Sequence, residues 1–281
     1  MKAVFLSILL IISILISYSQ KQHTNYSDLI KGDWIGVSDD TINERARHCF
    51  SFEDAVCSFP YPLNPYTKFT IEKNMLMLKS SRDTKKEKII KFSILKLDND
   101  SLVLRSPNTV SSKGEIISLS KSKPKNDLVF KTLYFSSSGC FGTCPSMLVK
   151  IDSSGHFFFY SRYGRFTNKM EGPYSGIFSA ENYLSLLNKI KNIPAEKVLP
   201  EYIATWTDDQ TCDINILTTS KTISSHVYGY DKEPIELRLL FNYLMDLYQH
   251  IPLSKLKILT EEDFKKEMGF ETNLQELKLY Y

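Results

Sequence analysis

The feature that most constrains the fold is a series of short extended segments between Asp33 and Leu119. Several alternate apolar with polar side chains, as in Ile94-Leu95-Lys96-Leu97, so that one face of each strand is apolar. Polar turns such as Lys73-Asn74 and Ser106-Pro107-Asn108 separate them. This pattern predicts a β meander or small barrel over residues 28–121. The expected strands are Asp33–Val37, Lys68–Glu72, Met75–Lys79, Ile89–Leu97, Ser101–Arg105 and Glu115–Leu119.

The first of these strands begins with Gly32-Asp33-Trp34. A Gly-x-Trp at this point resembles the start of lipocalin-like domains, and the resemblance covers about residues 28–120. It implies a small apolar ligand inside a barrel, provided that the inward side chains leave room: Phe69, Ile71, Ile94 and Leu102. The stretch His48–Pro65 is rich in Pro, Cys and aromatic residues, so we predict a long loop there that is cross-linked by a disulfide.

The polar, proline-containing segment Ser118–Asn126 predicts a linker and a domain boundary. The order beyond it is four strands, a helix, two strands and a helix, which predicts an α+β domain over 128–253. Both helices are expected on one face of an antiparallel sheet, one capped by Ser179 and one beginning at Pro234. Residues 254–281 form a tail with one short helix that ends near Gly269.

Residues 1–19 have the pattern of a secretory signal peptide. Lys2 supplies a positive start, Ala3–Ile16 is mostly apolar, and small residues allow cleavage near Ser19/Gln20. As a helix the apolar run reaches about 21 Å, short of the roughly 30 Å membrane core. The sequence therefore predicts an exported protein, periplasmic or secreted, whose mature chain has no transmembrane segment.

The charge of the chain argues against nucleic acid as a partner. The formal net charge is +3, and Lys2 leaves with the predicted signal peptide. Lysines and acids are mixed along the chain rather than gathered in a basic track. The 17 Phe and 16 Tyr residues supply ample core material, so the chain is not disordered.

A distinctive motif opens the second half: Ser138-Gly139-Cys140-Phe141-Gly142-Thr143-Cys144-Pro145. The later landmarks are Asp152-Ser-Ser-Gly155, Gly172-Pro173-Tyr174, Gly176, Thr207-Asp208, Tyr228 and Glu233-Pro234. Together they resemble the exported bacterial family known as domain of unknown function 6438, over about residues 128–251. The chain departs from that pattern at Ser146, where an aromatic residue is common, and at Asp209-Gln210. The resemblance implies a fold and an exported location, but no mechanism.

Five cysteines in an exported chain predict disulfide pairing. We expect two local bridges, Cys140–Cys144 and Cys49–Cys57, with Cys212 left as a buried thiol at the head of a core strand. The alternative is a redox or copper(I) site at Cys140 and Cys144. Such a site requires a helix directly after the cysteines, whereas Met147–Ile151 is expected to be a strand.

No other pattern predicts catalysis or metal binding. The histidines are scattered singly, there is no Gly-x-Ser-x-Gly, and the adjacent Asp208 and Asp209 would face opposite sides of a strand. The stretch His156–Tyr163 is apolar on both faces, which favours a strand covered on both sides. The alternative is a ligand or glycan platform, with these candidate binding residues: Tyr160, Arg162, Tyr163 and Asp208.

The sequence thus favours a non-catalytic binding or structural module of the cell envelope, without a cofactor. Its partner, a protein or a small molecule, is not identified. The first alternative is a small apolar ligand in the N-terminal barrel. The second is a thiol-redox or copper(I)-binding protein that acts through Cys140 and Cys144.

Overall fold

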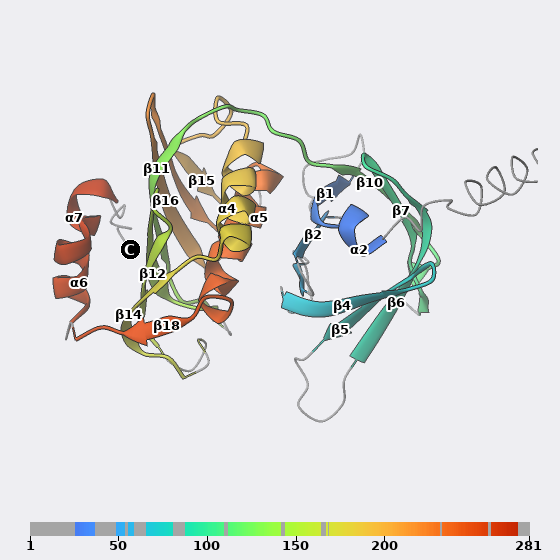
Figure 1. The fold of residues 1–281 in the computed structure, drawn as a ribbon, viewed down its shortest axis with the longest axis horizontal. Coiled ribbons are helices and arrows are strands. Elements are labelled where there is room, and N and C mark those ends of the chain that lie inside the picture. Colours follow the sequence, from blue (N-terminus) through green and yellow to red (C-terminus); the bar gives the residue numbers. More distant parts are fainter. Residues whose placement is uncertain are drawn as a thin grey trace, which may run out of the picture.

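The described residues of the computed structural model form two large β-sheets of different design (Figure 1). The predicted signal peptide, residues 1–19, lies outside the described residues. Within the described part of the chain, no helix has the length and apolar character that crossing a membrane requires. The structure describes residues 26–36, 49–53, 56–58, 66–80, 88–109, 112–141, 144–163, 167, 169–230, 232–257 and 260–274.

The first sheet is a closed barrel of eight strands, preceded by the short helix α2 (Tyr26–Leu29). All pairs are antiparallel, and β1 closes the barrel by pairing with both β2 and β10. This confirms the predicted small β-barrel. A separate ribbon consists of β8 (Asn108–Thr109) and β9 (Ser112–Lys113). The barrel strands are β1 (Gly32–Gly36), β2 (Cys49–Glu53), β3 (Val56–Ser58), β4 (Tyr66–Glu72), β5 (Met75–Ser80), β6 (Lys88–Leu97), β7 (Ser101–Arg105) and β10 (Ile116–Lys121).

The barrel interior is filled by its own side chains. The rings of Phe50 and Phe52 stack with centroids 5.7 Å apart, and Phe69 meets Phe52 edge-on at 5.1 Å. Phe69, Ile94 and Leu102, which would have to leave room for a ligand, are buried in this cluster. The interior of an eight-stranded barrel can be filled by side chains or can hold one small ligand. Here the packed rings occupy it, which does not favour an apolar ligand there.

The prediction of a loop over His48–Pro65 is wrong where β2 and β3 lie. The remaining residues of that stretch are outside the described part. Every second residue of β2 points into the barrel, so Phe50 and Phe52 join the core while Ser51 faces outward. Burial of these rings outweighs the local signals that argue against a strand.

The second sheet has eight strands in the order β15-β17-β16-β11-β12-β13-β14-β18. All pairs are antiparallel except β15 with β17, which is parallel. The predicted mixed β and α+β class is confirmed, but the short edge strands β15 and β18 were not anticipated. The strands are β11 (Phe130–Ser137), β12 (Met147–Asp152), β13 (His156–Ser161), β14 (Gly172–Ile177), β15 (Glu201–Ile203), β16 (Thr211–Thr218), β17 (Thr222–Tyr228) and β18 (Leu253–Lys255).

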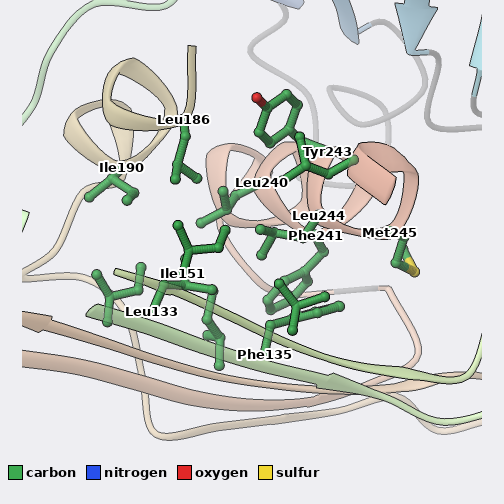
Figure 2. Close-up of a cluster of buried hydrophobic side chains, with 14 of the residues drawn as sticks. Leu133, Phe135, Ile151, Leu186, Ile190, Leu240, Phe241, Tyr243, Leu244 and Met245 are labelled. Carbon is green, nitrogen blue, oxygen red and sulfur yellow. The ribbon is translucent and has the colours of Figure 1, made fainter. Parts of the chain in front are cut away.

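Two helices cover the face of this sheet that is turned towards the barrel: α4 (Ala180–Asn192) and α5 (Ile235–Asp246), the latter extended by the 3-10 turn η2 (Leu247–Gln249). The hydroxyl of Ser179 accepts a hydrogen bond from the Asn182 amide at 3.2 Å, so the predicted cap is present. Figure 2 shows Leu186 of α4 and Leu240 of α5 above Leu133 and Ile151 of the sheet. These side chains belong to the largest apolar cluster among the described residues.

Two further helices cover the opposite face: α6 (Glu261–Met268) and α7 (Phe270–Asn273). The described part of the tail therefore has two helices rather than the one predicted, and Gly269 separates them with a left-handed φ of 77°. Along β13, Phe157 and Phe159 face α5 while Phe158 and Tyr160 face α6. The aromatic stretch is thus covered on both sides, as its composition predicts.

A buried ion cluster joins α4 to the barrel. The Lys189 ammonium lies 2.8 Å from carboxylate oxygens of both Asp33 and Glu53, and it also donates to the Ser51 hydroxyl. Burial by itself would lower the pKa of Lys189, but the two carboxylates hold it above its ordinary value. The two units have separate apolar cores, and their division into domains stays a prediction.

Candidate functional site

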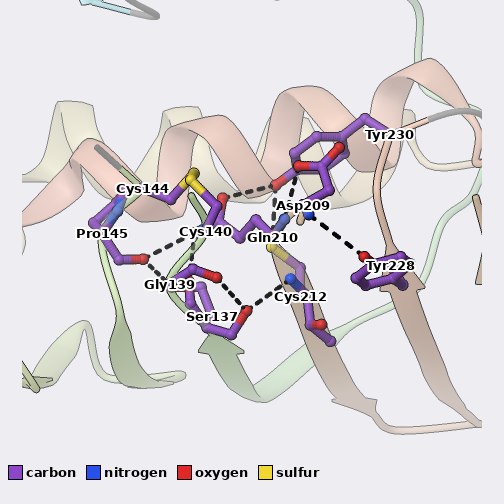
Figure 3. The surroundings of a disulfide bond; sticks show 12 residues. Ser137, Gly139, Cys140, Cys144, Pro145, Asp209, Gln210, Cys212, Tyr228 and Tyr230 are labelled. Carbon is purple, nitrogen blue, oxygen red and sulfur yellow. Dashed lines mark hydrogen bonds between the residues drawn. A yellow bond between two sulfur atoms is a disulfide. The ribbon is translucent and has the colours of Figure 1, made fainter. Parts of the chain in front are cut away.

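One end of the second sheet carries a disulfide between Cys140 and Cys144 (Figure 3). The sulfur atoms are 2.00 Å apart and the Cα atoms 5.5 Å apart. The bridged segment connects β11 to β12, and β11 pairs with β16 beside it. The first predicted disulfide is therefore present. We call residues 138–141, 144–145, 162–163 and 204–210 the disulfide end.

Hydrogen bonds hold the bridged segment against β16. The Gln210 side-chain amide donates to two carbonyls, those of Ser138 and Pro145, each at 2.9 Å. Ser137 Oγ donates to the same Pro145 carbonyl at 2.8 Å, and the Thr211 amide donates to Ser138 Oγ at 2.8 Å. These hydrogen bonds hold the described residues on both sides of the disulfide, which limits the conformational freedom of those residues.

A second segment packs beside the first. Asp208 has a left-handed φ of 65°, and its carbonyl accepts a hydrogen bond from the Phe141 amide at 3.4 Å. The Trp206 indole donates to Asp209 Oδ2 at 2.8 Å. A Cβ on Gly229 would lie 3.0 Å from Trp206 Nε1, and Gly229 also has a left-handed φ of 65°. Only glycine therefore fits beneath this tryptophan without strain.

Exposed aromatic side chains gather at the disulfide end. Phe141 is 94% exposed, Tyr163 is 61% exposed and Trp206 is 43% exposed. They come from three different segments, yet among the described residues the strongly exposed aromatic side chains are these three. Of these three, the sequence singled out Tyr163 alone. Phe141, Trp206 and Gln210 were missed, although Phe141 lies within the cysteine motif and Trp206 directly precedes the Thr207-Asp208 landmark.

Two of the candidate ligand residues suggested by the sequence, Tyr160 and Arg162, contact α6. The Tyr160 ring packs on Phe264 of α6, with centroids 5.4 Å apart. Arg162 binds the Glu261 carboxylate through Nε at 3.0 Å and Nη2 at 2.8 Å. Burial would raise the pKa of Glu261, but the Arg162 guanidinium holds it below its ordinary value. Tyr160 and Arg162 therefore anchor α6, and only Tyr163 of the three is well exposed.

The second predicted disulfide, Cys49–Cys57, is wrong. Cys57 lies opposite Phe52 and faces the barrel core, whereas Cys49 packs against Ile235 of α5 outside the barrel. Their thiols thus lie on opposite faces of the barrel wall, because side chains alternate along a strand. Burial raises the pKa of Cys49 to about 12 and that of Cys57 well above its ordinary value.

Cys212 is a buried thiol at the start of β16, as predicted. Its Sγ lies 3.1 Å from the Tyr230 hydroxyl, and burial raises its pKa far above the ordinary value. A thiol with a raised pKa is a poor nucleophile at neutral pH, because the thiolate is the reactive form. Cys212 is therefore not suited to attack the neighbouring disulfide.

The described residues include no group of three His, Cys, Asp or Glu side chains arranged to hold a metal ion. The described histidines each pair with one carboxylate: His156 with Asp152, His226 with Asp213 and His250 with Asp246. Strand β12 begins at Met147, so the disulfide is not followed by a helix whose amino end would lower a thiol pKa.

Residues 131–248 match the family described as "Domain of unknown function (DUF6438)". This match confirms the resemblance drawn from the Cys-x-Gly-x-Cys-Pro motif, and it includes both segments of the disulfide end around Cys140 and Trp206. The barrel lies outside the matched residues. No curated protein and no solved structure matches the chain.

Proposed function

We propose that this chain is an exported, non-catalytic binding module that docks a protein partner at its disulfide end. The observation that supports this function is the gathering of the exposed aromatic side chains Phe141, Tyr163 and Trp206 at one end of the sheet. Aromatic residues are enriched among the few residues that carry most of the energy of a protein interface.

The physical argument rests on exposure combined with rigidity. Complete burial of one large apolar side chain contributes about 1.5–3 kcal/mol, and Phe141 has nearly all of its surface available. Cys140 beside it is held by the disulfide, and Gln210 binds the carbonyls of Ser138 and Pro145, so ordering these described residues costs little conformational entropy on binding. Since Phe141 projects outward, it suits insertion into a pocket of another protein.

Export is proposed on two grounds. Residues 1–19 have the signal-peptide pattern. The Cys140–Cys144 disulfide is consistent with an oxidising compartment, where such bonds persist. N-terminal sequencing of the protein purified from the producing cells tests this part. A mature chain that begins near Gln20 supports export, and a chain that retains residues 1–19 contradicts it.

Site-specific photocrosslinking in the producing cells tests the docking. A photoreactive phenylalanine analogue at Phe141 is expected to capture one discrete protein. The matched control carries the analogue at Ile177, which is 61% exposed but lies at the opposite end of β14. The adduct should disappear when Trp206→Ala is added. Equal adducts at positions 141 and 177, or none at 141, would overturn the proposal.

The two alternatives from the sequence receive less support. The barrel core is occupied by mutually packed aromatic rings, which leaves the apolar-ligand function without a favouring observation. The thiol-redox function rests on Cys140 and Cys144 alone, since Cys212 is buried and its pKa is raised.

A further inference from the structure

A cleft of about 920 Å³ lies between the barrel and the α+β unit. Its walls come from the ends of β1 and β10, the segment that follows α4, and the start of α5. This volume is within the range of small-molecule sites, which often form between two structural units. The apolar part of the lining includes Ile35, Leu199 and Ile235.

Lysines dominate the charge of this cleft, which we call the lysine cleft. Its lining contains two carboxylates and five lysines: Lys121, Lys123, Lys125, Lys197 and Lys232. Both carboxylates are already neutralised. The buried Glu233 accepts a hydrogen bond from Arg238 Nε at 2.5 Å, and Glu236 binds Lys125.

Three of the lysines bind no carboxylate within the described residues. Lys121 donates to the Leu29 carbonyl at 3.0 Å and lies over the Trp34 ring, while burial lowers its pKa. Lys197 and Lys232 are exposed on the walls, and no described acid pairs with either. Like charges concentrated in a concave site raise the local concentration of oppositely charged ligands.

The start of α5 also faces the cleft, and Glu236 in its first turn is already bound by Lys125. The first amide groups of a helix have no partner within the helix, and the helix dipole favours an anion at that end. Pro234 provides no side-chain cap, and it lines the cleft together with Ile235. Phosphate groups bind well where helix amino ends and cationic side chains meet.

We propose that the lysine cleft binds a multiply charged, phosphate-bearing anion, either a small phosphate ester or a phospholipid headgroup. Lys197 and Lys232, together with Lys121, which binds no carboxylate, call for more than one negative charge. The cleft also has room beyond a single phosphate and an apolar wall for the remainder of the ligand. This site lies outside the disulfide end and does not depend on it.

Calorimetric titration of the mature protein with pyrophosphate at low salt tests whether the cleft binds a small phosphate ester. We expect saturable binding that weakens as salt is added, because screening reduces interactions between charges. Lys197→Gln/Lys232→Gln should weaken the affinity at least tenfold, and both changes fall on exposed side chains. The matched control, Lys91→Gln/Lys131→Gln, removes two exposed lysines elsewhere and should stay within twofold.

Co-sedimentation with phosphatidylcholine vesicles, with or without cardiolipin, whose headgroup carries two negatively charged phosphates, tests whether the ligand is a lipid headgroup. Binding to the anionic vesicles but not to pure phosphatidylcholine vesicles would assign a lipid headgroup as the ligand, provided that Lys197→Gln/Lys232→Gln abolishes it. Pyrophosphate binding without vesicle binding would assign a free phosphate ester. The proposal is overturned if neither probe binds, or if the cleft variant and the control variant lose affinity equally.

Discussion

The barrel and the α+β unit bury their strands in different ways. The barrel closes on itself, so each strand has one interior face and shows apolar residues at alternate positions, as in Leu102 and Leu104 of β7. The second sheet is open and has two faces. Helices α4 and α5 cover one, and α6 and α7 cover the other. Consecutive aromatic residues in β13 are therefore a sign of two covered faces.

The contact between the two units differs from both apolar cores, because a cluster of charged side chains lies at its centre. Lys189 is only 3% exposed and is neutralised by Asp33 and Glu53. Removal of one partner from a buried pair leaves uncompensated charge in a medium that solvates it poorly. Substitutions at this ionic contact, within each unit and on the surface should therefore lower the free energy of unfolding by different amounts.

The largest effect is expected at the ion cluster. Lys189→Met should lower the free energy of unfolding by about 3–5 kcal/mol, because the buried Asp33 and the partly buried Glu53 lose their cation. Urea denaturation measures the loss. The control is Lys221→Met, whose partner Glu196 is 91% exposed on its side chain and whose loss should cost about 0–1 kcal/mol. Similar losses in the two variants would refute the assigned role of Lys189.

The next largest effect is expected on the face of the second sheet that α6 and α7 cover. Phe264→Ala should cost about 3 kcal/mol, the lower end for a buried Phe, since a short surface helix relaxes more easily than a core. Hydrogen exchange should speed up in α6 and α7 and remain unchanged in the barrel. Leu184→Ala on the exposed side of α4 is the control. Unchanged exchange in α6 would mean that this helix does not depend on Phe264.

The disulfide has a smaller expected effect. Its loop is short, so Cys140→Ser/Cys144→Ser should reduce stability by about 2 kcal/mol through the entropy of the unfolded chain. A reductant should reproduce this loss in the parent protein and leave the double variant unaffected. Non-reducing peptide mapping should find Cys49 and Cys57 as thiols. A Cys49–Cys57 bridge in that map would contradict their placement on opposite faces.

The smallest effect is a pH dependence at the buried His226–Asp213 pair, whose atoms are 2.6 Å apart. The hydrogen bond to Asp213 raises the pKa of His226 above its ordinary value of 6.5. Protonation therefore stabilises the fold fully below pH 6.5, and this contribution is lost as pH rises through the raised pKa. The stability difference between the parent and His226→Gln should be larger at pH 5.5 than at pH 8.5. A pH-independent difference would contradict the assigned pair.

Local sequence predicted much of the fold. Turn residues and apolar alternation located most strands of both sheets, and the Ser179 cap marked the start of α4. The edge strands β15 and β18 escaped notice because three residues are too few to show a periodic pattern. The Cys-x-Gly-x-Cys-Pro motif predicted the disulfide, because a bridge between near neighbours depends on local geometry.

Other features depend on residues brought together from distant parts of the chain. No local pattern indicates which face of β2 carries Cys49, that Arg162 holds Glu261, or that Lys189 neutralises Asp33. The sequence by itself determined the strand-rich fold and the pairing of Cys140 with Cys144, because these follow from short-range periodicity and chain closure. Only the tertiary structure decided the aromatic disulfide end and the lysine cleft, since barrel closure and helix docking bring their side chains together.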